Sequence, residues 1–170
     1  MSFAPQVRSK PWIRPLLVSN DQLRRVELFT DLNDPSLDEL KALAEPWEAA
    51  PGETLVTESS QGEELFAIAK GRVEIFLSLP GGSQSESIAI LGEGEVLGES
   101  TLVGKARRIA TAVAKDDVLV LKWRKSDLLT LFEQEPAIGY RFMYALAKMV
   151  HERLTSTNMN LRNALNQILR

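Results

Sequence analysis

The chain has 170 residues, of which 44% are hydrophobic and 25% charged, a balance typical of one soluble domain with a sizeable core. Its net charge of −3 gives no overall basic field for nucleic acid, and the absence of cysteine excludes disulfides, cysteine-zinc sites and thiol nucleophiles. No apolar run approaches the roughly 20 residues of a membrane span, and the first residues lack the apolar region of a signal peptide. We therefore expect a cytoplasmic protein with no nucleic-acid or membrane partner.

The first part of the chain predicts an irregular arm followed by two helices. Residues 1–20 contain three prolines and few periodic apolar positions, which favours an irregular segment. A short helix is expected before Asp31, from the spacing of Leu23, Val26, Leu28 and Phe29. Residues 34–43 predict a second helix, with a proline in the first turn, acids early and leucines along one face.

From Trp47 onwards the pattern changes to short alternating runs separated by glycine turns. The predicted strands are residues 54–57, 64–70, 72–78, 87–91, 109–114 and 118–123. Several short strands at this spacing indicate an antiparallel sandwich or barrel. We assign residues 21–135 to this domain, together with its short flanking helices.

Two helices are predicted after the strands. The first begins at Ser126 or Asp127 and ends at Phe132, and the second runs from Pro136 to Arg170, roughly 50 Å at 1.5 Å per residue. A heptad pattern on the long helix has Ala147, Leu154, Leu161 and Ile168 at one seam position and Met143, Val150, Thr157 and Ala164 at the other. This stripe favours a parallel coiled-coil homodimer over residues 136–170, and the alternative is a helix folded back on its own barrel.

Candidate binding residues gather in the stretch 96–111. A glycine turn at Gly98 precedes Glu99 and a run that can open a short helix, and Arg108 follows nine positions after the glutamate. A helix N-terminus attracts an anion through its free N–H groups, and an arginine can hold a phosphate by a two-pronged contact. A carboxylate beside a phosphate is explained if it accepts a hydrogen bond from a sugar hydroxyl. These residues therefore indicate a site for a ribose-phosphate.

A plainer interpretation of the same charges stays open. Arg107 and Arg108 could form a solvated loop pair, and Glu99 could simply complement the dipole of a helix N-terminus. The single histidine, His151, lies on the polar side of the long helix and cannot form a zinc site without cysteines. No Gly-Lys-Ser/Thr phosphate loop occurs, and nothing in the sequence requires an enzyme.

These motifs also carry a family resemblance. Gly98-Glu99, a small apolar segment and Arg108-Ile109-Ala110-Thr111 resemble the phosphate-binding cassette of cyclic nucleotide-binding domains. The resemblance extends upstream to residues 92–97 and 64–73 and covers roughly residues 28–168. The family often has proline before the arginine, where this chain has Arg107. The resemblance implies a mainly β fold with flanking helices: a double-stranded β-helix (jelly-roll) barrel plus a long C-terminal dimerisation helix.

The implied function is that of a stand-alone sensor for a cyclic nucleotide. Ligand binding would order the cassette and shift the long helix, and an unknown downstream protein would read that shift, because the chain stops before the DNA-reading helices of related transcription factors. The alternative is a structural dimerisation or scaffold protein that binds no nucleotide. The implied ligand-binding residues are Leu97, Gly98, Glu99, Ser100, Arg108, Ile109, Ala110, Thr111, Thr157 and Asn158.

The resemblance also bears on the choice of base. Relatives that prefer cGMP often have threonine after the cassette arginine, and Ile109 offers no such hydroxyl, so cAMP is the expected ligand with cGMP as the alternative. In catabolite-activator-like relatives, Thr-Ser side chains of the long helix reach the adenine. Thr157 and Asn158 lie in a comparable part of this helix, or they simply set the coiled-coil register.

Overall fold

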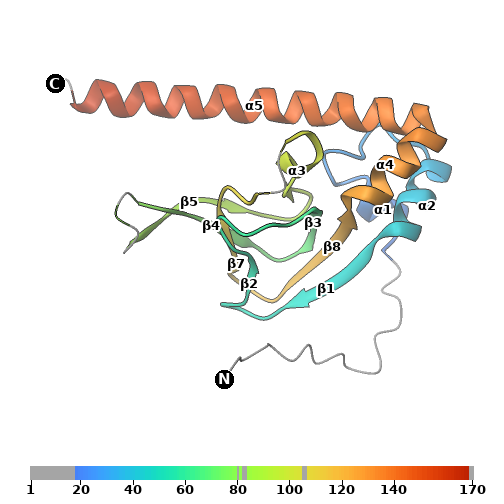
Figure 1. The fold of residues 1–170 in the computed structure, drawn as a ribbon, viewed down its shortest axis with the longest axis horizontal. Coiled ribbons are helices and arrows are strands. Elements are labelled where there is room, and N and C mark those ends of the chain that lie inside the picture. Colours follow the sequence, from blue (N-terminus) through green and yellow to red (C-terminus); the bar gives the residue numbers. More distant parts are fainter. Residues whose placement is uncertain (1–17, 80, 82–83, 105–106, 169–170) are drawn as a thin grey trace.

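The structure is a computed structural model that describes residues 18–79, 81, 84–104 and 107–168 (Figure 1). Residues 1–17 of the predicted arm and residues 169–170 of the predicted long helix lie outside these ranges. The described part contains two antiparallel four-stranded sheets with helices around them, which confirms the predicted mainly β architecture.

The strands are divided between two sheets, and the chain passes repeatedly from one sheet to the other. One sheet has the order β1 (Glu45–Ala49), β8 (Val118–Arg124), β3 (Glu64–Lys70) and β6 (Val96–Leu97). The other has the order β2 (Thr54–Val56), β7 (Thr111–Ala114), β4 (Val73–Ser78) and β5 (Ser85–Leu91). All pairings within the two sheets are antiparallel, and Glu74 of β4, for example, pairs with Ile90 of β5 and Val113 of β7.

Three differences from the predicted strands have local causes. β1 was missed because Pro46 weakens its strand signal, yet a proline is tolerated there because β1 is an edge strand. β6 was missed because it has only two residues. The strand predicted from residue 109 begins at Thr111, since the backbone of Arg108 is bonded to the segment before β3 instead of to a sheet.

The described residues form two apolar cores, and the β1-β8-β3-β6 sheet contributes to both. The core between the sheets contains Phe66, Ile68, Leu97, Val73, Ala112 and Val120. The second core lies between the β1-β8-β3-β6 sheet and the helices, and it includes Leu65, Trp123, Leu40, Leu128, Phe142 and Leu146. The Trp123 indole N–H donates to the Leu40 carbonyl oxygen at 2.8 Å, which fixes the second helix of the chain to β8.

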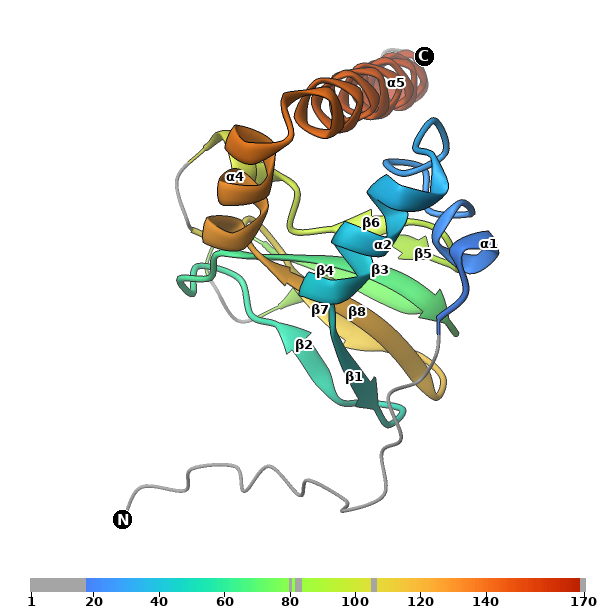
Figure 2. The ribbon, with the colours of Figure 1, turned by 90° about the vertical axis from the view of Figure 1, so that its right-hand side faces the viewer.

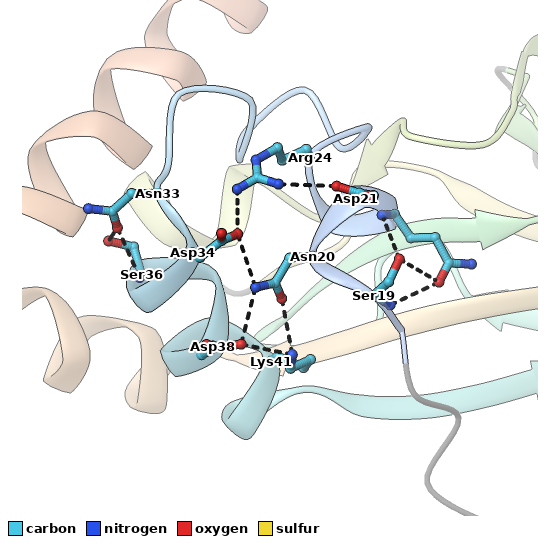
Figure 3. Close-up of polar contacts among 10 residues, drawn as sticks. Ser19, Asn20, Asp21, Arg24, Asn33, Asp34, Ser36, Asp38 and Lys41 are labelled. Carbon is cyan, nitrogen blue, oxygen red and sulfur yellow. Dashed lines mark hydrogen bonds and ion pairs between the residues drawn. The ribbon is translucent and has the colours of Figure 1, made fainter.

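Two short helices precede the barrel, α1 (Asn20–Leu23) and α2 (Asp34–Leu43). Helix α2 has the predicted bounds, with Asn33 as its N-cap. The expected short helix before Asp31 is only one turn long, and the chain continues in turns that still bury Leu28 and Phe29. Figure 3 shows how polar side chains join the two helices: the Asn20 amide donates to Asp38 at 3.2 Å and accepts from Lys41 at 3.0 Å.

The last two helices are α4 (Lys125–Gln134) and α5 (Pro136–Ile168). Figure 2 shows α4 and α2 on the same side of the sheets, with α5 seen nearly end-on above them. The first half of α5 packs on its own domain through Ile138, Gly139, Phe142, Leu146 and Met149. The first half of α5 therefore folds back on its own domain, and the dimer contact stays a prediction.

The second half of α5 has a different environment. Every residue from 154 to 168 is exposed, including the predicted seam residues Leu154 and Leu161, whose exposed fractions are 58% and 57%. These residues do not belong to the stripe that packs on the barrel. None of the helices in the described ranges combines the length and apolar character that a membrane span requires. A short helix, α3 (Ser100–Val103), lies between α5 and the barrel in Figure 1.

Candidate functional site

The candidate site begins at the turn between β6 and α3. Gly98 has φ +81°, in the left-handed region, and a Cβ there would lie 2.6 Å from both Arg108 Nη1 and the Glu64 carbonyl oxygen. Glycine is therefore required here for backbone geometry and for space. Glu99 follows as the N-cap of α3 in a helical conformation, and its side chain makes no capping bond. Glu99 thus stands at the N-terminus of α3 without capping it through its side chain, and its interpretation as an acid that complements the helix dipole stays open.

Arg108 is a buried cation, only 6% exposed. Its Nη1 donates to the Glu64 carbonyl oxygen at 2.9 Å and its Nη2 donates to Glu64 Oε2 at 2.8 Å. The guanidinium carbon lies 5.5 Å from the centroid of the Phe66 ring, a distance suited to a cation–π contact. Interpretation of Arg108 as a solvated loop residue is therefore wrong, whereas its neighbour Arg107 is exposed.

The backbone and a second glycine hold Arg108 in this position. The Arg108 N–H donates to the Ser60 carbonyl oxygen at 2.9 Å, and the Ser59 N–H donates to the Arg108 carbonyl oxygen at 2.8 Å. A Cβ on Gly62 would lie 2.5 Å from Arg108 Nε. The guanidinium thus lies close to Gly62 and Gly98 on separate turns, and both turns leave it the space it needs.

Burial and the neighbouring carboxylates act on Arg108 in opposite directions. Burial lowers the pKa of the Arg108 guanidinium, and the Glu64 and Glu99 carboxylates raise it. An arginine keeps its proton in proteins, so the group is a cation at neutral pH. The Glu99 carboxylate thus acts on the Arg108 pKa in the same direction as the Glu64 carboxylate.

A cavity of about 270 Å³ adjoins the Arg108 guanidinium. Its wall includes Lys122 and two aromatic side chains of the core between the sheets, Trp47 and Phe66. Gly62 and Glu64 also line it, whereas Glu99, Ile109 and Thr157 do not. Arg108 therefore borders this cavity, and Glu99 lies outside its lining.

Glu99 has a partner that the sequence pattern did not reveal. Arg153 of α5 donates from Nη1 to Glu99 Oε1 at 2.9 Å, and from Nη2 to the Val96 carbonyl oxygen at 3.0 Å and Glu27 Oε1 at 3.3 Å. Burial raises the pKa of the Glu27 carboxyl, while the Arg153 charge lowers it. The sequence contains one signal for this contact: Arg153 follows Met149, which is buried, by four residues on the same helix face.

The remaining predicted site residues are spread over several environments. Leu97 is buried in the core between the sheets, and the Thr111 hydroxyl accepts the Glu58 N–H at 2.9 Å, so both serve the fold. Ser100 and Ala110 are half-buried, and Ile109 is 71% exposed. Thr157 and Asn158 are exposed on α5, and the structure brings neither into contact with the cassette. The Thr157 hydroxyl donates to the Arg153 carbonyl oxygen at 2.8 Å.

A barrel with a buried arginine, a nearby glutamate and a covering helix defines a ligand-binding domain in which the helix contacts the site. Residues 46–135 match the family described as "Cyclic nucleotide-binding domain", and this match covers more than half of the chain. The chain belongs to the cyclic nucleotide-binding domain family. Among the residues that the structure describes, no cluster of three or more metal-ligating side chains is found.

Known proteins similar to this chain include a cyclic AMP receptor protein and a cGMP-dependent protein kinase. The cyclic AMP receptor protein of Thermus thermophilus is 32% identical over 101 residues, 59% of this chain and 46% of that protein. The human cGMP-dependent protein kinase 2 is 30% identical over 95 residues, 56% of this chain and 12% of that protein. The chain therefore spans less than half the length of these two curated relatives.

The fold has solved counterparts. The N-terminal domain of a transcriptional regulator from Streptomyces coelicolor superposes with a TM-score of 0.70 at 28% identity, covering 81% of this chain and 95% of that one. The catabolite activator protein of Thermus thermophilus gives a TM-score of 0.70 at 28% identity, with 79% and 61% covered. These structures confirm that the barrel with its flanking helices is the family's fold.

Proposed function

We propose that this domain is a sensor that binds cAMP in preference to cGMP and passes the binding event to a partner protein through α5. The single observation that carries the proposal is the buried Arg108 cation, held close to Gly62 and Gly98 and near the Glu99 carboxylate. A buried cation is costly unless it is paired, so a site that keeps one accessible from a cavity suits an anionic ligand.

The phosphate contact is assigned to Arg108. Its bonds to Glu64 use two of the five N–H groups of the guanidinium, and the others have no acceptor among the described residues. The N–H groups at the start of α3, on Glu99 and Ser100, precede the first intrahelical bond and are further donors for the same phosphate. Leu97, Ala110 and Thr111 then shape the cassette rather than touch the ligand.

The ribose contact is assigned to Glu99. Arg153 occupies Glu99 Oε1, so Oε2 is the acceptor proposed for the ribose 2′-hydroxyl. The contact with the base is assigned to the part of α5 that follows Arg153. Thr157 comes four residues later and shares the face of Arg153, whereas Asn158 comes five residues later and points about 140° away from Arg153. Thr157 is therefore the better candidate of the two for an adenine contact.

Exposed residues support the proposed preference for cAMP and the proposed dimer. Ile109 offers no hydrogen bond to a guanine, which favours cAMP. Leu154 and Leu161 are proposed to pair with a second copy, so that residues 136–170 form a dimer helix attached to the 21–135 barrel. The sensor is proposed to act without catalysis, nucleic acid or membrane, and the downstream protein that reads α5 is unknown.

Isothermal titration calorimetry with cAMP and with cGMP tests this function, using Arg108→Ala as the control for site binding. A second candidate, a nucleotide-free scaffold, rests on one observation: Glu64 already pairs with Arg108 in the structure. Heat of binding for cAMP in the wild type that disappears in Arg108→Ala supports the sensor. No binding of either nucleotide supports the scaffold.

A further inference from the structure

The first turns of α5 carry two exposed aromatic side chains on a face that does not pack on the barrel. Tyr140 is 72% exposed and Tyr144 is 62% exposed, and their stacked rings have centroids 6.3 Å apart. Successive helix residues are about 100° apart, so each tyrosine, two residues from the buried Phe142, points about 160° away from it. Packing within the described domain therefore does not account for these two aromatic side chains.

A hollow of about 440 Å³ lies beside the two rings. It is lined by Ala137, Tyr140, Arg141 and Tyr144 of α5, together with Asp31 from the segment between α1 and α2. Arg141 Nη1 donates to the Asp31 carbonyl oxygen at 2.9 Å, which joins the two walls of the hollow, and Figure 2 shows this segment rising toward α5. A groove lined by aromatic rings suits an apolar peptide that contains proline.

The hollow lies to one side of the proposed dimer seam. Tyr140 is seven residues before Ala147 and therefore continues the seam, whereas Ala137 and Tyr144 share a heptad position that flanks it. A second copy of α5 would cover Tyr140 and leave Tyr144 and Asp31 at the edge of the seam. A further occupant can therefore bind at Tyr144 beside a dimer.

The segment before α1 has a composition that matches this hollow. Residues 1–17 contain Trp12 between two prolines, and they have no acidic side chain. Their cations are Arg8, Lys10 and Arg14. Because the whole chain has a net charge of −3, the rest of the chain is more acidic still, and Asp31 is an exposed acid at the hollow itself. Charge and apolar surface therefore both favour an encounter between the two.

These residues also start close enough to the hollow to reach it. The Asn20 amide donates to Asp34 at 3.2 Å, and Asp34 is three residues after Asp31, so the start of α1 lies near the segment that lines the hollow. Fully extended, the chain from Val18 back to Trp12 spans about 20 Å, and residues 1–17 span about 55 Å.

We propose that residues 1–17 dock in this hollow of their own chain, with Trp12 against Tyr144 and the cations beside Asp31. Two aromatic rings in contact are stabilised beyond the area that they bury, and tryptophan offers the largest such surface. The docked segment would hold the first turns of α5 to the segment between α1 and α2. This inference goes beyond the proposed function, because it requires no bound nucleotide.

Fluorine NMR of the full chain labelled with 5-fluorotryptophan tests the docking. The Trp12→Phe variant identifies the resonance of Trp12 among those of the three tryptophans. We expect this resonance to lie away from its position in urea-unfolded protein and to move to that position in Tyr144→Ala. Met159→Ala is the matched control, since it removes a side chain that is 62% exposed on the second half of α5, and it should leave the resonance unchanged.

Hydrogen exchange of the full chain measures the same contact from the side of the helix. Trp12→Ala should speed exchange over residues 137–144 at least about fivefold, because the docked segment shields these turns from local opening. Phe3→Ala removes an aromatic side chain nearer the start of the same segment and should change this exchange much less.

Three results would overturn the proposal. A wild-type Trp12 resonance at its unfolded position would show that the segment does not dock, and a displaced resonance that ignores Tyr144→Ala would place the contact elsewhere. The third result uses the variant in which Leu154 and Leu161 are both changed to Glu. Loss of the displaced resonance or of the protection over residues 137–144 in that variant would show that a second copy, and not the same chain, completes the contact.

Discussion

Arg108 and Glu64 are joined at two points, through the backbone carbonyl oxygen at 2.9 Å and through carboxylate Oε2 at 2.8 Å. Two bonds from one planar guanidinium fix its orientation as well as its position. The cation is thus held in place at the cavity, and in the proposed site a phosphate would not have to order it on binding.

Arg108→Ala should weaken cAMP binding by roughly 2–4 kcal/mol, because a desolvated phosphate would lose a charge-assisted partner. Calorimetric titration checks this value. Arg107→Ala is the matched control, since Arg107 is exposed and its loss should matter much less. An Arg108→Ala protein that binds cAMP within twofold of wild type would remove Arg108 from the site.

Gly98→Ala should destabilise the domain by more than about 1 kcal/mol and also weaken cAMP binding, because alanine is strained at φ +81° and its Cβ would displace Arg108. Urea denaturation measures the first effect. Gly81→Ala is the control: Gly81 has φ +103° but no neighbouring atom within 4 Å of an added Cβ. Equal losses in the two variants would mean that the contact with Arg108 has no effect.

Glu99→Gln should reduce discrimination between cAMP and 2′-deoxy-cAMP, because the amide is a weaker acceptor for the ribose 2′-hydroxyl than a carboxylate. Parallel titrations of the two nucleotides give the ratio of affinities. Glu93→Gln, at an exposed turn position, should leave the ratio unchanged. If the wild-type protein binds both nucleotides equally, Glu99 does not recognise the sugar.

Wild-type protein should be a dimer, and changing Leu154 and Leu161 together to Glu should yield monomers, since like charges would face each other across the seam. Sedimentation velocity measures the mass of both proteins. Met159→Glu serves as the control, because Met159 is exposed on a different face of α5. A monomeric wild type would contradict the coiled coil.

The wild type should bind cAMP more tightly than cGMP by about 1–3 kcal/mol, the range for one or two hydrogen bonds to a buried group. Thr157→Val should shrink that difference and leave the phosphate contacts intact, whereas Asn158→Ala should not. Competition titrations with the two nucleotides check both statements. A preference for cGMP would exclude Ile109 and Thr157 from base selection.

Local features of the site could be predicted from the sequence because their signals lie within a few residues of each other. Gly98 is required by its own φ, and helix α2 has its proline and cap within one turn. The partners of the two charged site residues could not be predicted in this way. Arg108 meets Glu64 across 44 positions, and Arg153 meets Glu99 across 54, and both contacts depend on how distant elements pack.

The helix predicted from the spacing of Leu23, Val26, Leu28 and Phe29 is wrong for a different reason: the sequence pattern predicts more helix than the structure has. The apolar spacing there resembles a helix face, but Leu28 and Phe29 are buried from a series of turns that packs against the barrel. Tertiary burial decided the backbone conformation, and the pattern alone could not distinguish the two ways of burying the same side chains.

The exposed second half of α5 extends beyond the contact at Arg153, so a tilt of the helix about that contact would be amplified toward its end. At about 1.5 Å per residue, Ile168 lies about 22 Å beyond that contact, so a tilt of about 10° moves the tip by about 4 Å. In the proposed sensor, a small displacement at the cassette would therefore become a movement the size of a side chain at the far end of α5. A protein bound to the end of α5 would therefore detect a change at the cassette without contacting the cassette.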